Sequence, residues 1–264
     1  MPGPRVIASA RALTITGGHG HNIGIAREVD GADDARKAVR EQIKAGARSI
    51  KVIATGGVLT PGIGATFTAM TVEEIGAAVQ EAHSWGRGVA AHAIGEEGIM
   101  RAVRAGVDSV EHCVQATPVV VREMVSRGTF RGATLSALLG ISQNPGVPAY
   151  AAEKARALVE EARAAHARCV RAGVRHVLST DAGTPFNPHG NAPNEAARMV
   201  DWGTRPLDAM IAATANGADL LRLPDVGRIA PGMRADLVLY DENPVEAIEA
   251  LRRPRSVWKD GVKV

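Results

Sequence analysis

The sequence is poor in cysteine and in aromatic residues, which narrows what can hold the chain together. It has two cysteines in 264 residues, and Phe, Trp and Tyr together make up 3%. Cys113 and Cys169 lie in unrelated segments, and neither belongs to a CxxC pair. We therefore expect neither a disulfide framework nor a thiolate zinc site, and we expect a reducing, cytoplasmic location. The core must be built mainly from Ala, Val, Ile and Leu.

The sequence also lacks the features of a membrane or nucleic-acid protein. No apolar run approaches the ~20 residues that span a bilayer. The start, "MPGPRVIASA", has no charged segment followed by a long apolar one, so it does not read as a signal peptide. The net charge is +3, and basic residues alternate with acidic ones, as in "DDARKAVRE" at 33–41. That pattern is typical of a solvated helix face, so neither a membrane nor a nucleic-acid partner is expected.

What the sequence does contain is a recurring pair of elements. A helical stretch ends in glycine and is followed by a short apolar strand, as in "REQIKAGARSIKVIATGG" and "HARCVRAGVRHVLSTDAG". Glycine favours the left-handed cap at a helix end. Strands that are apolar on both faces are typical of a buried parallel sheet. The alternation predicts an α/β architecture.

The pattern places the expected elements as follows. Six inner strands are expected near 5–10, 49–54, 88–92, 107–112, 129–134 and 174–180. Helices are expected near 31–45, 71–85, 95–105, 117–127, 150–172, 191–202 and 206–221. Beyond Leu223 the pattern changes to short strands with turns, so we expect an α/β body over 1–223 and a small β extension over 224–264.

Four titratable residues lie at the ends of otherwise apolar strands. They are Lys51 in "SIKVIATGG", His92 in "GVAAHA", His112 in "DSVEHC" and Asp181 in "HVLSTDAGTP". The carboxyl ends of parallel strands meet at one edge, so these side chains should converge. Imidazole and carboxylate suit zinc. Singly, each also has a structural explanation, such as a packed core histidine, a snorkelling lysine or a helix-capping aspartate.

At these residues the sequence resembles the metal-dependent amidohydrolase superfamily, in particular its imidazolonepropionase-like and Xaa-Pro dipeptidase-type branch. The motifs on which the resemblance rests are "IKVIATGG", "AAHAIGEEGI", "DSVEHC" and "LSTDAGTP", together with the tail "GRIAPGMRADLVLYDENPVEAI". The resemblance implies a (β/α)8 TIM-type barrel beside a small β-sandwich. It also implies hydrolysis of an amide, peptide or cyclic C–N bond in a small, dipeptide-like substrate.

The resemblance further assigns roles to the four residues. His92 and His112 would bind one zinc ion, and Lys51, carboxylated by CO2, would bridge it to a second. Asp181 would be a ligand of the second ion and the general base. The chemistry is consistent, because two divalent ions activate a shared water and a nearby carboxylate can move its proton to the leaving amine.

The pair His19-Gly20-His21 admits two interpretations. On a strand, residues i and i+2 point to the same side, so both imidazoles could reach one metal. The family's HxH pair, however, lies on the first barrel strand, whereas this one precedes Lys51 by a single strand. Glycines at 17, 18 and 20 also argue against an ordered strand. A loop after the third strand, facing the substrate, is the favoured interpretation.

Five residues are candidate substrate contacts on weaker grounds: His19, His21, Gly56, Gly57 and Arg131. The glycines would present backbone amides from "ATGGVLTPG", and Arg131 would pair with a substrate carboxylate. The competing interpretations are a loop histidine, a flexible turn and a surface arginine.

The six expected strands would leave the barrel two short, which exposes strand edges. A truncated gene product or misassigned start, completion by another subunit, and a differently closed fold all stay open, and so does a homo-oligomer. One alternative function is an inactive, truncated amidohydrolase remnant or pseudoenzyme with at most one metal. A third possible function is an α/β module that binds a small molecule without metal. The four strand-end residues argue against it.

Overall fold

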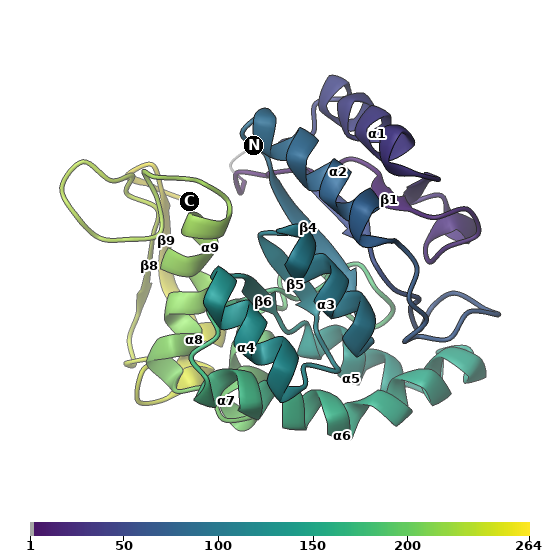
Figure 1. Cartoon of the computed structure of the whole chain (residues 1–264). Helices are drawn as coiled ribbons and strands as arrows, with labels where there is room; N and C mark the ends of the chain where they lie inside the picture. The colour runs from purple at the N-terminus through teal and green to yellow at the C-terminus, as the bar shows by residue number, and fades with distance from the viewer. Residues whose placement is uncertain (1–2) are drawn as a thin grey trace.

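The computed structural model describes residues 3–264 and shows a parallel sheet covered by helices, followed by a small antiparallel sheet (Figure 1). The strands of the main sheet are β1 (Ala12–Thr14), β2 (Ala26–Glu28), β3 (Ser49–Ile53), β4 (Gly88–Ala93), β5 (Ser109–His112), β6 (Phe130–Gly132) and β7 (His176–Val177). The α-helices are α1 (Ala32–Lys44), α2 (Val72–Ser84), α3 (Glu96–Ala105), α4 (Pro118–Arg127), α5 (Leu135–Gln143), α6 (Ala149–Arg171), α7 (Ala192–Asp201), α8 (Pro206–Ala213) and α9 (Ala215–Leu220). The expected α/β architecture is confirmed.

The main sheet is parallel throughout and is open. Its strand order is β2-β1-β3-β4-β5-β6-β7. Every neighbouring pair is parallel, for example Ile53 of β3 opposite His92 of β4, and Ala93 of β4 opposite His112 of β5. Within residues 3–264, β2 and β7 are the two edges and do not pair with each other. The carboxyl ends of β3, β4 and β5 therefore lie side by side at one rim of the sheet.

Local sequence signals account for the helix ends. Thr71 caps α2 in a capping box, in which its hydroxyl accepts from the amide of Glu74 and the Glu74 carboxylate accepts from the amide of Thr71. Thr117 caps α4, which starts with Pro118. Gly106 and Gly128 end α3 and α4 in the left-handed conformation, as the helix–glycine–strand pattern indicates.

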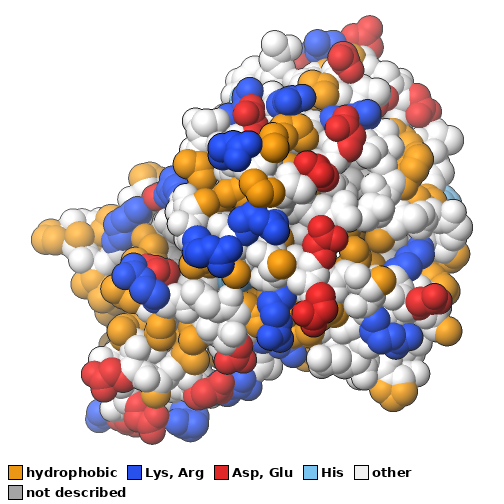
Figure 2. Space-filling view, turned by 60° about the horizontal axis from the view of Figure 1, so that its bottom comes forward, with side chains coloured by type: hydrophobic (Ala, Val, Ile, Leu, Met, Phe, Trp, Pro, Cys, Tyr) orange, Lys and Arg blue, Asp and Glu red, His pale blue; other side chains and the backbone are white. Residues whose placement is uncertain are grey.

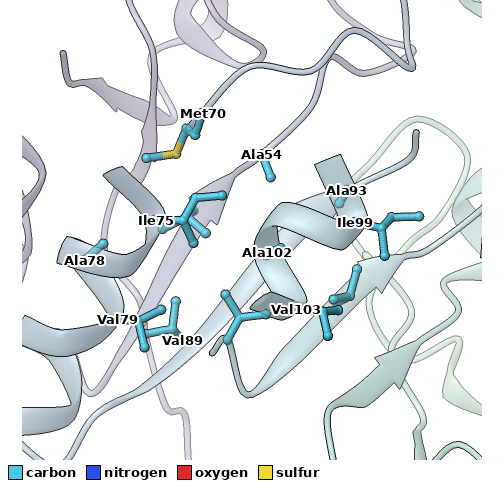
Figure 3. Close-up of a cluster of buried hydrophobic side chains, with 14 of the residues drawn as sticks. Ala54, Met70, Ile75, Ala78, Val79, Val89, Ala93, Ile99, Ala102 and Val103 are labelled. Atoms are coloured by element: carbon cyan, nitrogen blue, oxygen red, sulfur yellow. The ribbon is translucent and has the colours of Figure 1, made fainter. Parts of the chain in front are cut away.

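The outer face of the sheet carries the main hydrophobic core. Figure 3 shows Val79 of α2 beside Val89 of β4 and Ile99 of α3 near Ala93, and Ile75 and Val103 belong to the same buried cluster. These are small aliphatic side chains, as the scarcity of aromatic residues requires. Their alternation with inward-facing residues fixes which side chains of β3, β4 and β5 point into the interior of the curved sheet.

The C-terminal strands form a separate antiparallel sheet. Its order is β10-β9-β8, with β8 (Leu237–Tyr240), β9 (Pro254–Lys259) and β10 (Val262–Lys263). It lies beside α8 and α9 in Figure 1. Arg5, at the other end of the chain, forms ion pairs with Asp236 and, at 2.6 Å, with Asp260. The two ends of the chain are thus tied together at this sheet.

The structure differs from the sequence-based elements in four places. The strand expected at 5–10 is irregular, and β1 begins only after Ala10, whose φ of 54° breaks the extension. β2 was not predicted, because three residues carry too little pattern to recognise. The helix α5 was missed because Leu135–Gln143 contains no charged residue to mark an exposed face. The helix expected over 206–221 is two helices, broken at Thr214.

The surface is mixed in charge. Figure 2 shows lysine and arginine side chains interspersed with aspartate and glutamate over the face in view. Ion pairs between helices, such as Arg40 of α1 with Glu81 of α2 at 2.8 Å, contribute to this pattern. Within the described part of the chain, no helix is both long and apolar enough to cross a membrane.

Candidate active site

Three imidazoles lie in a row at the carboxyl rim of the sheet. The ring centroids of His19 and His92 are 4.7 Å apart, and those of His92 and His112 are 4.6 Å apart. His92 is near the end of β4, His112 ends β5, and His19 lies in the loop between β1 and β2. The structure therefore brings the two predicted histidine ligands together and adds His19 from a loop distant in sequence.

His92 is held in one tautomer by a backbone carbonyl. Its Nε2 lies 2.6 Å from the carbonyl oxygen of Gly56, which can only accept a hydrogen bond. Nε2 therefore carries the proton and Nδ1 is left with a lone pair. The position of Gly56 is fixed sterically, because a β-carbon there would lie 2.0 Å from the carbonyl oxygen of Gly64.

His112 is held in the opposite tautomer by Thr134. Its Nδ1 is 2.7 Å from the Thr134 hydroxyl, and that hydroxyl donates its own proton to the carbonyl of Ala133 at 2.8 Å. The hydroxyl oxygen must then accept from Nδ1 of His112, which leaves the lone pair on Nε2. A metal-binding imidazole with its other nitrogen hydrogen-bonded in this way is the usual arrangement in metal sites.

His19 occupies space that a glycine leaves free. Its Nδ1 contacts the Thr60 hydroxyl at 2.7 Å. A β-carbon on Gly57 would lie 2.4 Å from the His19 ring, so no other residue fits at 57 without moving that ring. Gly56 and Gly57 thus determine where the rings of His92 and His19 lie.

Lys51 and Asp181 line one cavity of about 390 Å³ on the inner side of the sheet. Lys51 is half-buried in the middle of β3, and Asp181 follows β7. Asp181 is exposed to the cavity, but the surrounding protein atoms reduce its hydration and so raise the pKa of its carboxyl, an effect that the positive charge of Lys51 and then His19 opposes. These two residues face the same space as predicted.

Burial keeps the imidazoles neutral. Loss of hydration is the largest cause of the lowered pKa in each case, to about 4 for His19 and about 3 for His112, and well below the ordinary range for His92. The nearby Lys51 adds to the effect on all three. Neutral imidazole is the form that binds metals.

One interior carboxylate was missed by the sequence reasoning. Glu111 of β5 accepts hydrogen bonds from the hydroxyls of Ser109 and Ser179, each at 2.7 Å, and lines the same cavity as Lys51. Gly132 of β6 makes room for it, because a β-carbon there would lie 2.0 Å from Glu111 Oε2. The sequence signal that could have identified Glu111 is its position next to Val110 in "DSVEHC", because adjacent residues of a strand point to opposite faces of the sheet.

Two predicted residues do not join the row of imidazoles. His21 is exposed in a short 3-10 helix (η1, His21–Ile23), with Nδ1 turned back to the carbonyl of Gly18 at 2.7 Å. The favoured loop interpretation of His19-Gly20-His21 is therefore the one that the structure adopts. Arg131 is completely buried and contacts His166 on the outer side of the sheet, away from the cavity.

The side chains of the site do not form a complete metal site as they stand. Within residues 3–264, no three His, Cys, Asp or Glu side chains stand in an arrangement that could hold an ion as they are. The candidate donors are two neutral histidines with complementary lone pairs at the rim, and a lysine amine and a carboxylate that line the cavity. Conversion of the amine to a carbamate would supply an anionic oxygen as the third ligand. The residues present therefore fit a divalent ion through a modified lysine.

Comparison with known proteins places the chain. The model of the amidohydrolase family matches residues 1–264. Ochratoxinase from Aspergillus niger is 33% identical over 290 residues, which cover 98% of this chain and 60% of that protein. Imidazolonepropionase from Streptomyces griseus subsp. griseus is 34% identical over 63% of this chain and 39% of its own length. This chain thus spans about 60% of the length of the ochratoxinase.

The solved structures agree with the sequence comparison. A Xaa-Pro dipeptidase with methionine bound in its active site superposes with a TM-score of 0.94 at 32% identity, over all of this chain and 69% of that one. The structure of A. niger ochratoxinase gives 0.89 at 32% identity, over 99% of this chain and 66% of that one. The match runs through every strand that carries the site. The chain belongs to the amidohydrolase family.

Proposed function

We propose that this chain is a metal-dependent hydrolase that cleaves the C–N bond of an amide, a peptide or a cyclic amide in a small substrate. The observation that carries the proposal is the pair His92 and His112, 4.6 Å apart, locked in tautomers that leave Nδ1 of one and Nε2 of the other free. Relatives named as Xaa-Pro dipeptidase, ochratoxinase and imidazolonepropionase support this bond class. Zinc suits imidazole and carboxylate donors.

Each residue has a role that its position allows. His92 and His112 would hold one zinc ion, and Lys51 as a carbamate would bridge to a second where one binds. Formation of the carbamate joins the amine nitrogen to the carbon of CO2 and releases one proton. A bound ion lowers the pKa of water and polarises the scissile carbonyl.

Asp181 would be a ligand and the general base. Its carboxylate opens onto the cavity that Lys51 also lines, so it can accept a proton from water and return it to the departing amine nitrogen. His19, beside His92, would bind the carbonyl or a carboxylate of the substrate. Gly56 and Gly57 would act on the substrate through the histidines that they position.

The substrate we propose is a dipeptide or N-acyl amino acid. The relatives include a structure described as a prolidase complexed with N-methylphosphonate-L-proline, at 30% identity and a TM-score of 0.89. Dipeptides with a C-terminal proline are thus the first substrates to test.

The test is hydrolysis of such dipeptides by the zinc- and bicarbonate-treated chain, compared with Asp181→Asn. We expect turnover in the wild type and its loss in Asp181→Asn, with unchanged circular dichroism. Asp201→Asn, at the exposed end of α7, is the matched carboxyl-to-amide control and should retain activity. Equal turnover in Asp181→Asn would remove that residue from the mechanism.

A second candidate, an inactive amidohydrolase-type chain with at most one metal, is favoured by one observation. The described residues offer no ready-made three-ligand cluster of His, Cys, Asp or Glu. It predicts zinc binding without hydrolysis of any dipeptide. The two candidates are separated when zinc stoichiometry is measured on the same preparation as the turnover described above.

A further inference from the structure

A completely buried guanidinium lies behind the candidate site. Arg131 is on β6, and its side chain is 0% exposed. Its neighbour Gly132 faces Glu111 in the cavity, so alternation along the strand sends Arg131 to the opposite, helix-covered side. A charge in such a place is costly unless it is held by good hydrogen bonds, which raises the question of what this one does.

Two neutral imidazoles hold one arm of the guanidinium. Nη1 donates to Nδ1 of His166 at 2.9 Å and lies 3.4 Å from Nε2 of His176. The second nitrogen of each ring is engaged elsewhere, His166 Nε2 with the Thr204 hydroxyl at 2.8 Å and His176 Nδ1 with the carbonyl of Val174 at 2.9 Å. Since arginine has no acceptor, both rings must present a lone pair to it. The guanidinium is therefore fixed from α6 and β7.

The other arm reaches the backbone of the candidate site. Nη2 of Arg131 donates to the carbonyl oxygen of His112 at 3.4 Å. That carbonyl belongs to a strained turn, because His112 and Cys113 have φ values of 68° and 50°, which non-glycine residues rarely adopt. Two consecutive residues in this region persist only when their surroundings hold them.

The turn decides where the His112 ring lies. On a regular strand, His112 would point to the same side as Val110, which is buried in the outer core. Its ring instead stacks edge-on at 4.6 Å from His92, an inner-facing residue of β4. The left-handed backbone at the end of β5 is what returns the ring to the inner side.

We propose that Arg131 is a positioning residue for His112, which holds the left-handed turn at 112–113 through the His112 carbonyl and so presents Nε2 for metal binding. This rests on the proposed function only in that His112 is to bind a metal. It replaces the expectation that Arg131 contacts a substrate carboxylate, which its complete burial on the far side contradicts.

The test compares Arg131→Lys and Arg131→Gln with Arg168→Gln as the matched control. Arg168 is on α6, where its guanidinium donates to the carbonyl of Ala116, so the control loses the same kind of bond near β5 without touching His112. Two readouts are used: the dissociation constant for Zn²⁺ by chelator competition, and the Nδ1–H signal of His112 in ¹⁵N NMR spectra of the metal-free chain.

We expect both Arg131 variants to bind Zn²⁺ roughly 10- to 100-fold more weakly, the range found for groups that orient metal ligands. They should also lose the slowly exchanging Nδ1–H signal of His112, whereas Arg168→Gln behaves as the wild type. Folded Arg131 variants that keep both properties would overturn the proposal.

A further measurement uses the wild-type chain and therefore does not depend on whether a variant folds. A nuclear Overhauser effect between the Arg131 guanidinium protons and the β-protons of Cys113 is expected, because the His112 carbonyl oxygen lies on the same side of its trans peptide as Cα of Cys113, and Arg131 also approaches the Cys113 side chain. Its absence contradicts the proposal. If the wild type binds no Zn²⁺, the proposed function fails, while the two NMR readouts still decide the role of Arg131.

Discussion

Gly57 lies beneath the imidazole of His19 so closely that a β-carbon at position 57 would be 2.4 Å from the ring. The absence of a side chain at 57 is thus what allows His19 to lie beside His92. Gly57→Ala should displace His19 and lower kcat/KM by roughly 10- to 100-fold, since displacement of a site group by about 1 Å has effects of that order.

The control for this substitution lies in the same loop. A β-carbon on Gly64 meets nothing within 4 Å, and its φ is not in the left-handed region, so Gly64→Ala should be neutral. Dipeptide hydrolysis by the two variants is the measurement. Equal activity in Gly57→Ala and Gly64→Ala would mean that His19 takes no part in the reaction.

Thr134→Val should weaken zinc binding while leaving the shape of the side chain almost unchanged. The substitution removes the oxygen that accepts from His112 Nδ1, so the ring is free to rotate and to change tautomer. We expect a zinc dissociation constant that is roughly 10- to 100-fold larger. Thr134→Ser retains the hydroxyl and should restore affinity, and a Ser variant as weak as the Val variant would argue against the hydrogen bond.

Stability should fall as the pH is lowered from about 6.5 to 5. Burial, the largest cause, lowers the pKa of His166 to about 2 and of His176 to about 3. Below pH 6.5 the unfolded chain therefore binds more protons than the folded one. The contribution of these neutral rings to the free energy of unfolding is complete above that pH and decreases progressively below it. Each such histidine accounts for about 1.4 kcal/mol per pH unit.

Urea denaturation at pH 6.5 and pH 5 measures this dependence, in a window above the ordinary pKa of Asp and Glu. His176→Gln keeps an acceptor for Arg131 and a donor for Val174 but cannot titrate, so the fall should be shallower than in the wild type. His189→Gln, at an exposed loop position, is the matched control. A slope that is the same in all three chains would contradict the assignment of neutral buried rings.

The sequence predicted the strands that carry the site because each is an apolar run after a glycine-ended helix. It located Lys51, His92, His112 and Asp181 on or just after strands of one sheet. The structure places the two histidines at the carboxyl rim, and it places Lys51, in the middle of β3, in the lining of one cavity with Asp181. Their roles as ligands and base stay predictions.

The geometry around His112 was beyond the sequence. Nothing in "DSVEHC" marks two left-handed residues, because neither His112 nor Cys113 is a glycine or asparagine. Arg131 was placed on a strand correctly, but a strand with buried residues on both faces gives no sign of which face is inner. Its pairing with His166 depends on the docking of α6, which no local pattern encodes.

The central claim is that His92 and His112 together bind a metal, and zinc content per folded chain tests it most directly. Wild type, the His92→Ala/His112→Ala double variant and His21→Ala would each be loaded with Zn²⁺ and bicarbonate, desalted and measured by elemental analysis beside circular dichroism. The account predicts one or two zinc ions per chain in the wild type and in His21→Ala, and none in the folded double variant. Zinc retained by the double variant, or absent from the wild type, would contradict it.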